Sequence, residues 1–355
     1  QTTQSAGLFS TAWNTTPPFS DGPTIVNNTS TSRDFNGNQS VLDKIAADDI
    51  TSRANYAYSF LAALGLVAAC FLLYSFIHTY KAQRRLAWHD CLLCAFCSFQ
   101  LLLLFLSLHS VAYRPKYLHT TGLGCATLSF TINTVSLCGL LILVLMAYVL
   151  TLDPPSHSLL RKPGVCVALV ILTSVLISLL LAGIRGPRDG LQESSICYMD
   201  PVSASYAAAR LCLVLLIPYT LQLGLLICGC VRQFRSNGRF LSGSEDGPVF
   251  LTVTLVMFLC HLFYSVALMR GAQLAKDGLN VHERAFMSVA EFVLFSASSA
   301  SLLLVLAIHK PSRENLQGAS RQLRDCCRNP GHTQPNRNII APHIEITDTL
   351  QDIES

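Results

Sequence analysis

Three ionisable residues stand inside long apolar runs of the sequence: Arg210, His261 and Glu291. An ionised side chain within a bilayer is costly, so such residues face the interior of a helix bundle and mark binding or transport sites. A base and an acid in such places can anchor a charged ligand, and a histidine can form part of a pocket floor. In the alternative interpretation, each residue is paired structurally, or Arg210 extends to the membrane interface.

The remaining polar residues do not combine into catalytic chemistry. An enzyme needs a nucleophile beside its base, or several ligands at one depth. His78, His89 and His309 lie at one edge of the apolar runs, whereas His109 and His261 lie at different levels, and no G-x-S-x-G sequence occurs. We therefore expect that the chain is not an enzyme.

Cys91, Cys94 and Cys97 lie close to His89, but they do not predict a metal centre. A zinc site needs cysteine pairs that converge from separate turns with a fourth ligand, whereas these cysteines follow one apolar run. Cysteine also packs as a small hydrophobic residue. We expect no metal and no cofactor.

The elements that must position these residues are membrane-spanning helices. A helix needs about 20 apolar residues to cross a bilayer. Seven such runs occur, at about 57–79, 87–112, 121–152, 163–184, 204–230, 249–270 and 285–308. They predict an all-α membrane protein whose residues 57–309 form a seven-transmembrane helix bundle.

The composition agrees with a membrane protein. Only 13% of the 355 residues are charged and 51% are hydrophobic, whereas about a quarter of the residues of a soluble domain are charged. The net charge is +4 and the basic residues are scattered, which gives no indication of a nucleic-acid partner. The lipid bilayer is the expected surrounding.

Residues 1–56 are rich in Ser, Thr, Asn and Asp, so we expect a disordered extracellular tail. Its four N-x-[ST] sequons, at Asn14, Asn27, Asn28 and Asn38, predict glycosylation. Because the chain opens on Gln1 and has no apolar stretch before residue 57, either a signal peptide has been removed, which we expect, or the sequence has been trimmed.

The residues after the last run predict a helix on the membrane surface. Within residues 310–327, Leu316, Ala319, Leu323 and Cys327 recur at helical spacing and form one apolar stripe. Cys326 and Cys327 end this stripe and are candidates for palmitoylation, with unmodified thiols as the alternative. Residues 328–355 are polar and predict a disordered tail, and the basic residues of 310–328 favour a cytoplasmic C-terminus.

Cys125 opens the third run, and Cys197 lies in the connection before the fifth run. One cysteine at a helix tip and one in a loop that folds over the bundle suit a disulfide in an oxidising compartment. Two unrelated free thiols are the alternative.

In architecture, residues 57–327 resemble a rhodopsin-like G-protein-coupled receptor. The resemblance rests on the seven runs, the sequon-rich tail, Cys125, Cys197, Pro218 in the fifth run and the terminal cysteines. It implies that Arg210 and Glu291 face one ligand cavity, with His261 one level deeper. It does not support a light receptor, since residues 285–308 contain no lysine for a retinal Schiff base.

The activation motifs of that family are replaced. The family's Asp-Arg-Tyr corresponds to Val149, Leu150 and Thr151, and Gln100 takes the place of the sodium-binding aspartate. The residues in place of Cys-Trp-x-Pro and Asn-Pro-x-x-Tyr include His261, Phe263, Ser301, Leu302 and Val305. We expect an atypical plasma-membrane receptor for an unknown extracellular ligand, with weak or unconventional coupling to a G protein or arrestin. A non-signalling membrane interaction partner is the alternative, and an intramembrane enzyme or transporter is a further one.

Glycosidase digestion tests the expected extracellular position of the N-terminus. At least part of the set Asn14, Asn27, Asn28 and Asn38 should carry glycans, although Asn27 and Asn28 adjoin, so we expect one of them to be empty. Digestion of the protein from mammalian cells should increase its gel mobility, and replacing all four asparagines by Gln should abolish that change. Unchanged mobility of the native chain after digestion would contradict both the glycans and the orientation.

Overall fold

The computed structural model describes residues 31–84, 87–112, 122–151, 162–185, 199–235, 247–275 and 280–328. The chain divides into two compact units, Gln1–Ala46 and Ala47–Ser355. Within the described ranges the regular elements are all helices. The predicted all-α class is confirmed.

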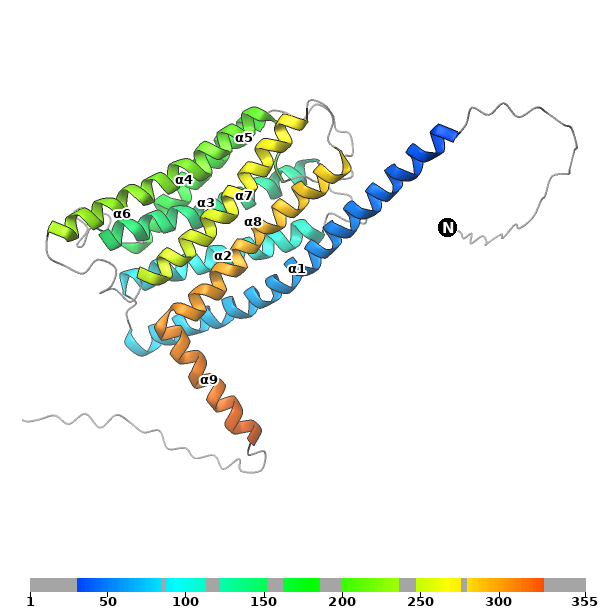
Figure 1. The fold of residues 1–355 in the computed structure, drawn as a ribbon. Helices are drawn as coiled ribbons and strands as arrows, with labels where there is room; N and C mark the ends of the chain where they lie inside the picture. The colour runs from blue at the N-terminus through cyan, green and yellow to red at the C-terminus, as the bar shows by residue number, and fades with distance from the viewer. Residues whose placement is uncertain are drawn as a thin grey trace, which may run out of the picture. The chain divides into compact units, whose positions relative to one another are not determined.

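Seven helices are long and apolar enough to cross a membrane, which confirms the predicted seven-helix bundle. Figure 1 shows these helices. In chain order, the elements are α1 (Thr31–Gln83), α2 (Trp88–Ala112), α3 (Gly122–Thr151), α4 (Pro163–Arg185), α5 (Ala204–Arg210), the π-helix η2 (Leu211–Leu216), α6 (Ile217–Arg235), α7 (Gly247–Leu274), α8 (Val281–Ile308) and α9 (Lys310–Arg328). The segments α5, η2 and α6 together contain the fifth candidate span, Ala204–Arg232.

Helix α1 begins earlier than the sequence analysis expected. It starts at Thr31, so residues 31–56 are helical where an unstructured tail was predicted. The stretch from Val41 contains neither proline nor glycine before Gly65. Once a helix is nucleated, each further residue adds a hydrogen bond at little cost, so the span can propagate into this stretch. An ion pair at 2.9 Å between Arg53 and Asp49, one turn apart, adds to it.

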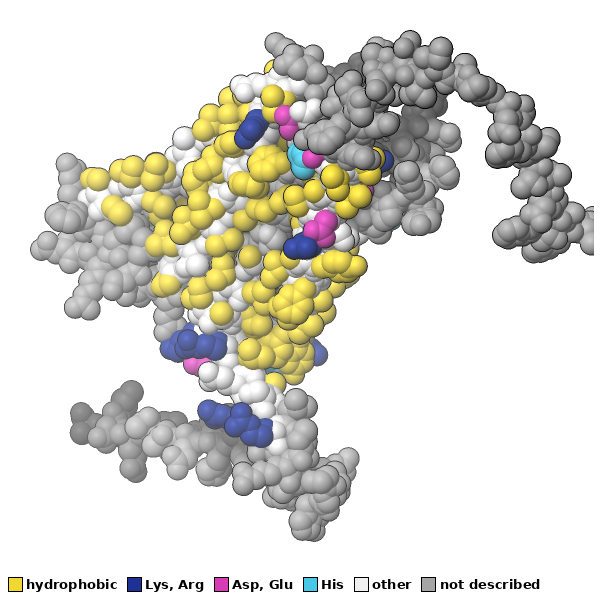
Figure 2. Space-filling view, turned by 45° about the vertical axis from the view of Figure 1, so that its right-hand side comes forward, with side chains coloured by type: hydrophobic (Ala, Val, Ile, Leu, Met, Phe, Trp, Pro, Cys, Tyr) yellow, Lys and Arg dark blue, Asp and Glu magenta, His cyan; other side chains and the backbone are white. Residues whose placement is uncertain are grey.

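The helices turn apolar side chains outward, as lipid contact requires. On α4, Leu172, Leu176 and Leu179 are exposed, whereas Ser174 and Ser178 on the other face are buried. Figure 2 shows hydrophobic side chains over much of the described surface that faces the viewer. Small polar residues on the inner face allow close packing of transmembrane helices, which explains this reversed pattern.

Helix α9 confirms the helix predicted after the last span, and it is fixed to the ends of α1, α2 and α8. The imidazole of His309, between α8 and α9, lies 3.7 Å from the carboxylate of Asp90 on α2 and 2.8 Å from the hydroxyl of Ser312. Asn315 of α9 donates a hydrogen bond of 2.8 Å to Ser75 of α1. These contacts define the α9 end of the bundle.

Helices α1 and α8 pack closely at Gly65. A Cβ atom added at Gly65 would lie 2.8 Å from the Cβ and Oγ of Ser299 and 2.9 Å from its Cα. Rotation of the serine side chain cannot relieve the contact with Cα, which belongs to the backbone. The two helices can approach this closely only because residue 65 has no side chain.

Gly65→Ala should therefore destabilise the protein by about 1–3 kcal/mol, the usual cost of overpacking. Thermal unfolding of the detergent-purified protein measures the change. Gly224→Ala on α6 is the matched control, because nothing lies within 4 Å of a Cβ there and alanine favours helix. Equal midpoint temperatures for the two variants would show that α1 and α8 do not depend on this contact.

Candidate functional site

A buried polar cluster lies at the end of the bundle opposite α9. Its centre is Asp200, in the non-helical segment Met199–Ser203 that precedes α5, and the carboxylate side chain has an exposure of 0%. We call the five residues Asp200, Arg210, Tyr206, Tyr264 and Asn133 the Asp200 cluster. All of them are buried. An aspartate so placed requires partners, because a buried unpaired charge is very unfavourable.

The donors converge on both oxygens of the Asp200 carboxylate. Oδ1 accepts a hydrogen bond of 2.5 Å from the hydroxyl of Tyr206 and one of 3.3 Å from the amide of Asn133. Oδ2 accepts a hydrogen bond of 2.7 Å from the hydroxyl of Tyr264 and pairs with Nη1 of Arg210. Each oxygen therefore accepts contacts from two donors, and these protein groups take the place of the water that would surround an exposed carboxylate.

The guanidinium of Arg210 is enclosed by two kinds of contact. It forms the ion pair with Asp200, and its Cζ lies 4.6 Å from the centre of the Tyr264 ring. A cation above an aromatic face is attracted by the ring's electrons, more strongly where water is excluded. Tyr264 thus contacts both members of the ion pair, one through its ring and the other through its hydroxyl.

Helix geometry explains how the donors come together. Tyr206 and Arg210 are one turn apart on α5 and share a face. Asn133 comes from α3 and Tyr264 from α7, and both helices pack against the fifth span. Ser203 caps α5 with an extended backbone, and its N–H donates a hydrogen bond of 2.9 Å to the carbonyl of Pro201. This turn directs Asp200 back toward the first turns of α5.

A second set of contacts holds the residue before Asp200. The backbone carbonyl of Met199 accepts a hydrogen bond from Ser129 of α3 and another of 3.5 Å from Arg185 at the end of α4. Arg185 also donates a hydrogen bond of 2.9 Å to the Ser129 hydroxyl. The segment Met199–Ser203 is thus tied to α3, α4, α5 and α7.

The fifth span changes its helical form directly after Arg210. Residues Leu211–Leu216 form a π-helix, and Pro218 follows in α6. Proline has no N–H to donate to the preceding turn, so its neighbourhood departs readily from the α-helical bond pattern. Isolated π-helical turns occur often at functional sites, and this one adjoins the Asp200 cluster.

The structure buries all three ionisable residues that the sequence analysis selected. Arg210 belongs to the Asp200 cluster. His261 of α7 lies 3.3 Å from the hydroxyl of Ser136 on α3 and 2.8 Å from the carbonyl of Met257. Glu291 is buried on α8 with an exposure of 3%. Asp200 was not selected, because a single aspartate in a connection carries no periodic signal.

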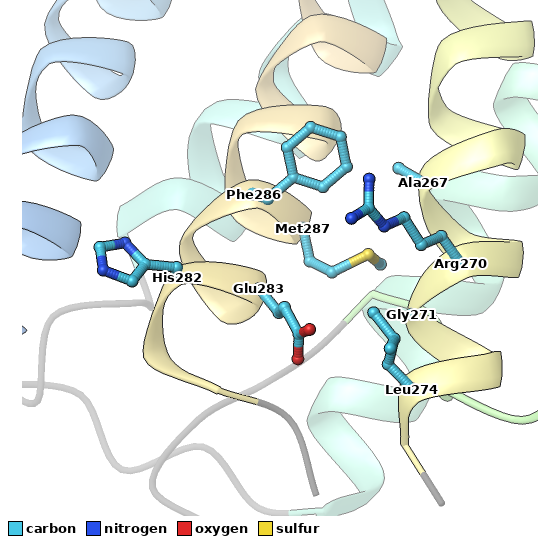
Figure 3. Close-up of a pocket in the computed structure, with 8 residues that line it drawn as sticks. All are labelled: Ala267, Arg270, Gly271, Leu274, His282, Glu283, Phe286 and Met287. Carbon is cyan, nitrogen blue, oxygen red and sulfur yellow. The ribbon is translucent and has the colours of Figure 1, made fainter. Parts of the chain in front are cut away.

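A separate pocket of about 240 Å³ lies between α7 and α8. Figure 3 shows Arg270 and Leu274 on α7 facing Phe286 and Met287 on α8. The pocket is lined by Ala267, Arg270, Gly271, Leu274, His282, Glu283, Phe286 and Met287, so it contains none of Arg210, His261 and Glu291. A Cβ added at Gly271 would lie 3.6 Å from a methyl group of Val202, which places the pocket beside the segment Met199–Ser203.

Several predicted sites lie outside what the structure describes. They are Cys197, the sequons at Asn14, Asn27 and Asn28, and the side chains of Asn38, Cys125, Cys326 and Cys327. The disulfide, the glycans and the palmitoylation remain predictions.

No family model matches the sequence. No curated protein matches it either. The seven candidate spans indicate a multi-pass membrane protein.

Removing one member of the ion pair should cost more than removing both charges. Arg210→Gln leaves the carboxylate of Asp200 buried without its cation, which typically costs about 3–5 kcal/mol. In the double variant Arg210→Gln/Asp200→Asn, most of that loss should be recovered, because two neutral amides can bond to each other and to the phenols. Thermal unfolding of the purified variants measures the cycle.

Arg270→Gln supplies the control for the loss of an arginine from the same end of the bundle. Its side chain is exposed, so its replacement should change stability by no more than about 0.5 kcal/mol. Additive losses from the Arg210 and Asp200 substitutions would contradict the coupling between the two side chains.

Proposed function

We propose that the chain is a ligand-responsive plasma-membrane receptor, an atypical relative of the rhodopsin-like G-protein-coupled receptors. The observation that carries the proposal is the Asp200 cluster, a buried charged site that joins three spans to the connection between spans four and five. Polar groups converging within an apolar surrounding are the usual composition of a ligand site. The seven candidate spans and the helix after the last span agree with this proposal.

In the proposed orientation, the N-terminus is extracellular and the C-terminus is cytoplasmic. The sequons support the first statement, and the basic residues of α9 support the second through the positive-inside rule. The Asp200 cluster is then near the extracellular surface, because α5 begins and α7 ends beside it. A ligand from outside the cell would reach this end of the bundle first.

The opposite end of α3 supports weak or unconventional coupling to G proteins. Val149 and Leu150 pack against the hydrophobic core, where the family carries a charged pair. The hydroxyl of Thr151 bonds within its own helix, to the carbonyls of Ala147 at 2.9 Å and Tyr148 at 3.1 Å. Apolar packing thus replaces an electrostatic lock that could break and re-form between two states.

Helix α7 gives the same indication. It runs without interruption from Gly247 to Leu274, and Phe263, which takes the place of the family's proline, contacts the ring of Phe286 at 5.9 Å. A proline would remove a hydrogen bond and allow a kink there. At the position of the sodium-binding aspartate, Gln100 is fully buried and is uncharged. These replacements also favour the second candidate function, a non-signalling partner of other membrane proteins.

A cell assay of G-protein dissociation and arrestin recruitment tests this proposal. We expect the native chain to give weak or no G-protein dissociation. Leu150→Arg should not restore it, since Val149 supplies no acid and α7 lacks its proline. Equal surface amounts of the two chains are required, and a conventional receptor serves as the positive control. Robust G-protein activation by the native chain would show that the missing motif was never limiting, whereas silence in every channel would favour the non-signalling partner.

A further inference from the structure

The Asp200 cluster has the composition of a carboxylate-binding site. A guanidinium, two phenols and an amide supply donors to the two oxygens, and among the described residues the acidic group that accepts these four contacts is Asp200. Charge-assisted hydrogen bonds of this kind are the strong contacts by which proteins recognise carboxylates. Nothing in this donor set requires the carboxylate to belong to the same chain.

The donors and the Asp200 carboxylate belong to different kinds of backbone. Arg210, Tyr206, Asn133 and Tyr264 project from helices, whose backbone hydrogen bonds fix their positions. Asp200 belongs to the non-helical segment Met199–Ser203, which is tied down by side chains and by one backbone turn. The donors can therefore stay in place while the occupant leaves.

Stability alone is a weak reason for such a cluster. The desolvation of two charges offsets much of their attraction, and well-packed apolar residues often serve equally well. A charged pair that crosses from a connection into a bundle is better suited to an element that exchanges between two states.

We propose that Asp200 occupies a carboxylate-binding site in place of a ligand, and that a ligand carrying a carboxylate on an apolar body binds there by displacing the segment Met199–Ser203. This proposal rests on the proposed receptor function and names the chemical class of the ligand. The apolar body follows from the residues that leave with Asp200: Met199 is buried and Val202 is half-buried. The pocket between α7 and α8 adjoins Val202 and offers further apolar room.

Because Asp200 is covalently connected to α5, a ligand must bind tightly enough to compete with it. A group joined to its site by a short connection has an effective concentration in the millimolar range or above. Acetate, which offers only the carboxylate, is therefore excluded from the native site. Each additional buried methylene strengthens binding about fourfold, so hexanoate gains roughly two orders of magnitude over acetate when its chain is buried.

The first experiment vacates the site and refills it. The purified full-length chain is compared as native, Asp200→Asn, Asp200→Gly and Asp200→Gly/Arg210→Gln, with thermal unfolding measured in sodium acetate. Acetate should raise the midpoint temperature of Asp200→Gly by about 3–5 °C with saturation. The rise should be smaller for Asp200→Asn and absent for the native chain and the double variant. Equimolar sodium chloride and acetamide are the controls.

The second experiment uses the native chain, with hexanoate as the probe and hexanamide as its neutral control. Hydrogen exchange is read at the amides of Ser203 and Ala207, which bond to the carbonyls of Pro201 and Ser203 at 2.9 Å. Hexanoate should accelerate exchange at Ser203 several-fold by displacing the segment, and hexanamide should not. Because Asp200→Asn keeps the shape of the side chain, it remains informative if Asp200→Gly does not fold.

The outcomes separate this proposal from the receptor function. An equal acetate response in all variants, or none in both Asp200→Gly and Asp200→Asn, would overturn the carboxylate site. A saturating acetate response of Asp200→Gly with unchanged exchange in the native chain under hexanoate would overturn the displacement. A graded acetate response and faster native exchange, in a chain that signals in no cellular assay, would support the site while rejecting the receptor function.

Discussion

The ion pair between Asp200 and Arg210 is the constraint on which one end of the bundle depends. Both charges are removed from water, so each must be compensated by protein groups. The compensation comes from α3, α5 and α7, whose side chains all reach the same carboxylate. A carboxylate held at this point thus fixes the relative positions of these helices by electrostatics, in an environment where apolar packing discriminates poorly between alternatives.

Apolar packing discriminates poorly here because the surrounding solvent is lipid. Lipid tails are as apolar as the outward leucines of α4, so the exclusion of apolar surface from water does not hold transmembrane helices together. Close contacts such as Gly65 against Ser299, and polar contacts such as the hydroxyl pair of Tyr58 and Ser107 at 2.5 Å, must do so instead. Polar contacts join the helices at both ends of the bundle. The Asp200 cluster lies at one end, and the contacts of His309 with Asp90 and of Asn315 with Ser75 lie at the other.

The sequence predicted most of the fold because the bilayer imposes a length and a composition on every span. Runs of apolar residues located the seven helices within a few residues at most ends, and the spacing of Leu316 and Ala319 located α9. The prediction for residues 31–56 was wrong. Their Ser, Thr, Asn and Asp content suggested disorder, but the helix of the first span propagates into them.

The candidate site was predicted only in part. Arg210, His261 and Glu291 were visible because charged or titratable residues contrast with apolar neighbours. Asp200 was invisible for the opposite reason, because an aspartate in a polar connection contrasts with nothing. Its partners Tyr206, Tyr264 and Asn133 are ordinary residues of the candidate spans, and only the packing of α3, α5 and α7 brings them together. Contacts distant in sequence leave no local pattern.

The length of α1 has a consequence for the height of the bundle in the bilayer. Its candidate span, Val41–Ala82, has 42 residues, which at a rise of about 1.5 Å each amount to about 63 Å, roughly twice the hydrocarbon thickness. Length therefore does not locate the membrane along this helix. The charged residues locate the membrane along α1. Asp48, Asp49 and Arg53 precede a stretch that contains no Asp, Glu, Lys or Arg before Lys81. This stretch is about 40 Å long, close to the full thickness of a bilayer with its headgroups. The first span is registered in the membrane by the last charge before it, and moving that charge by one turn would shift the lipid boundary along α1 by about 5 Å.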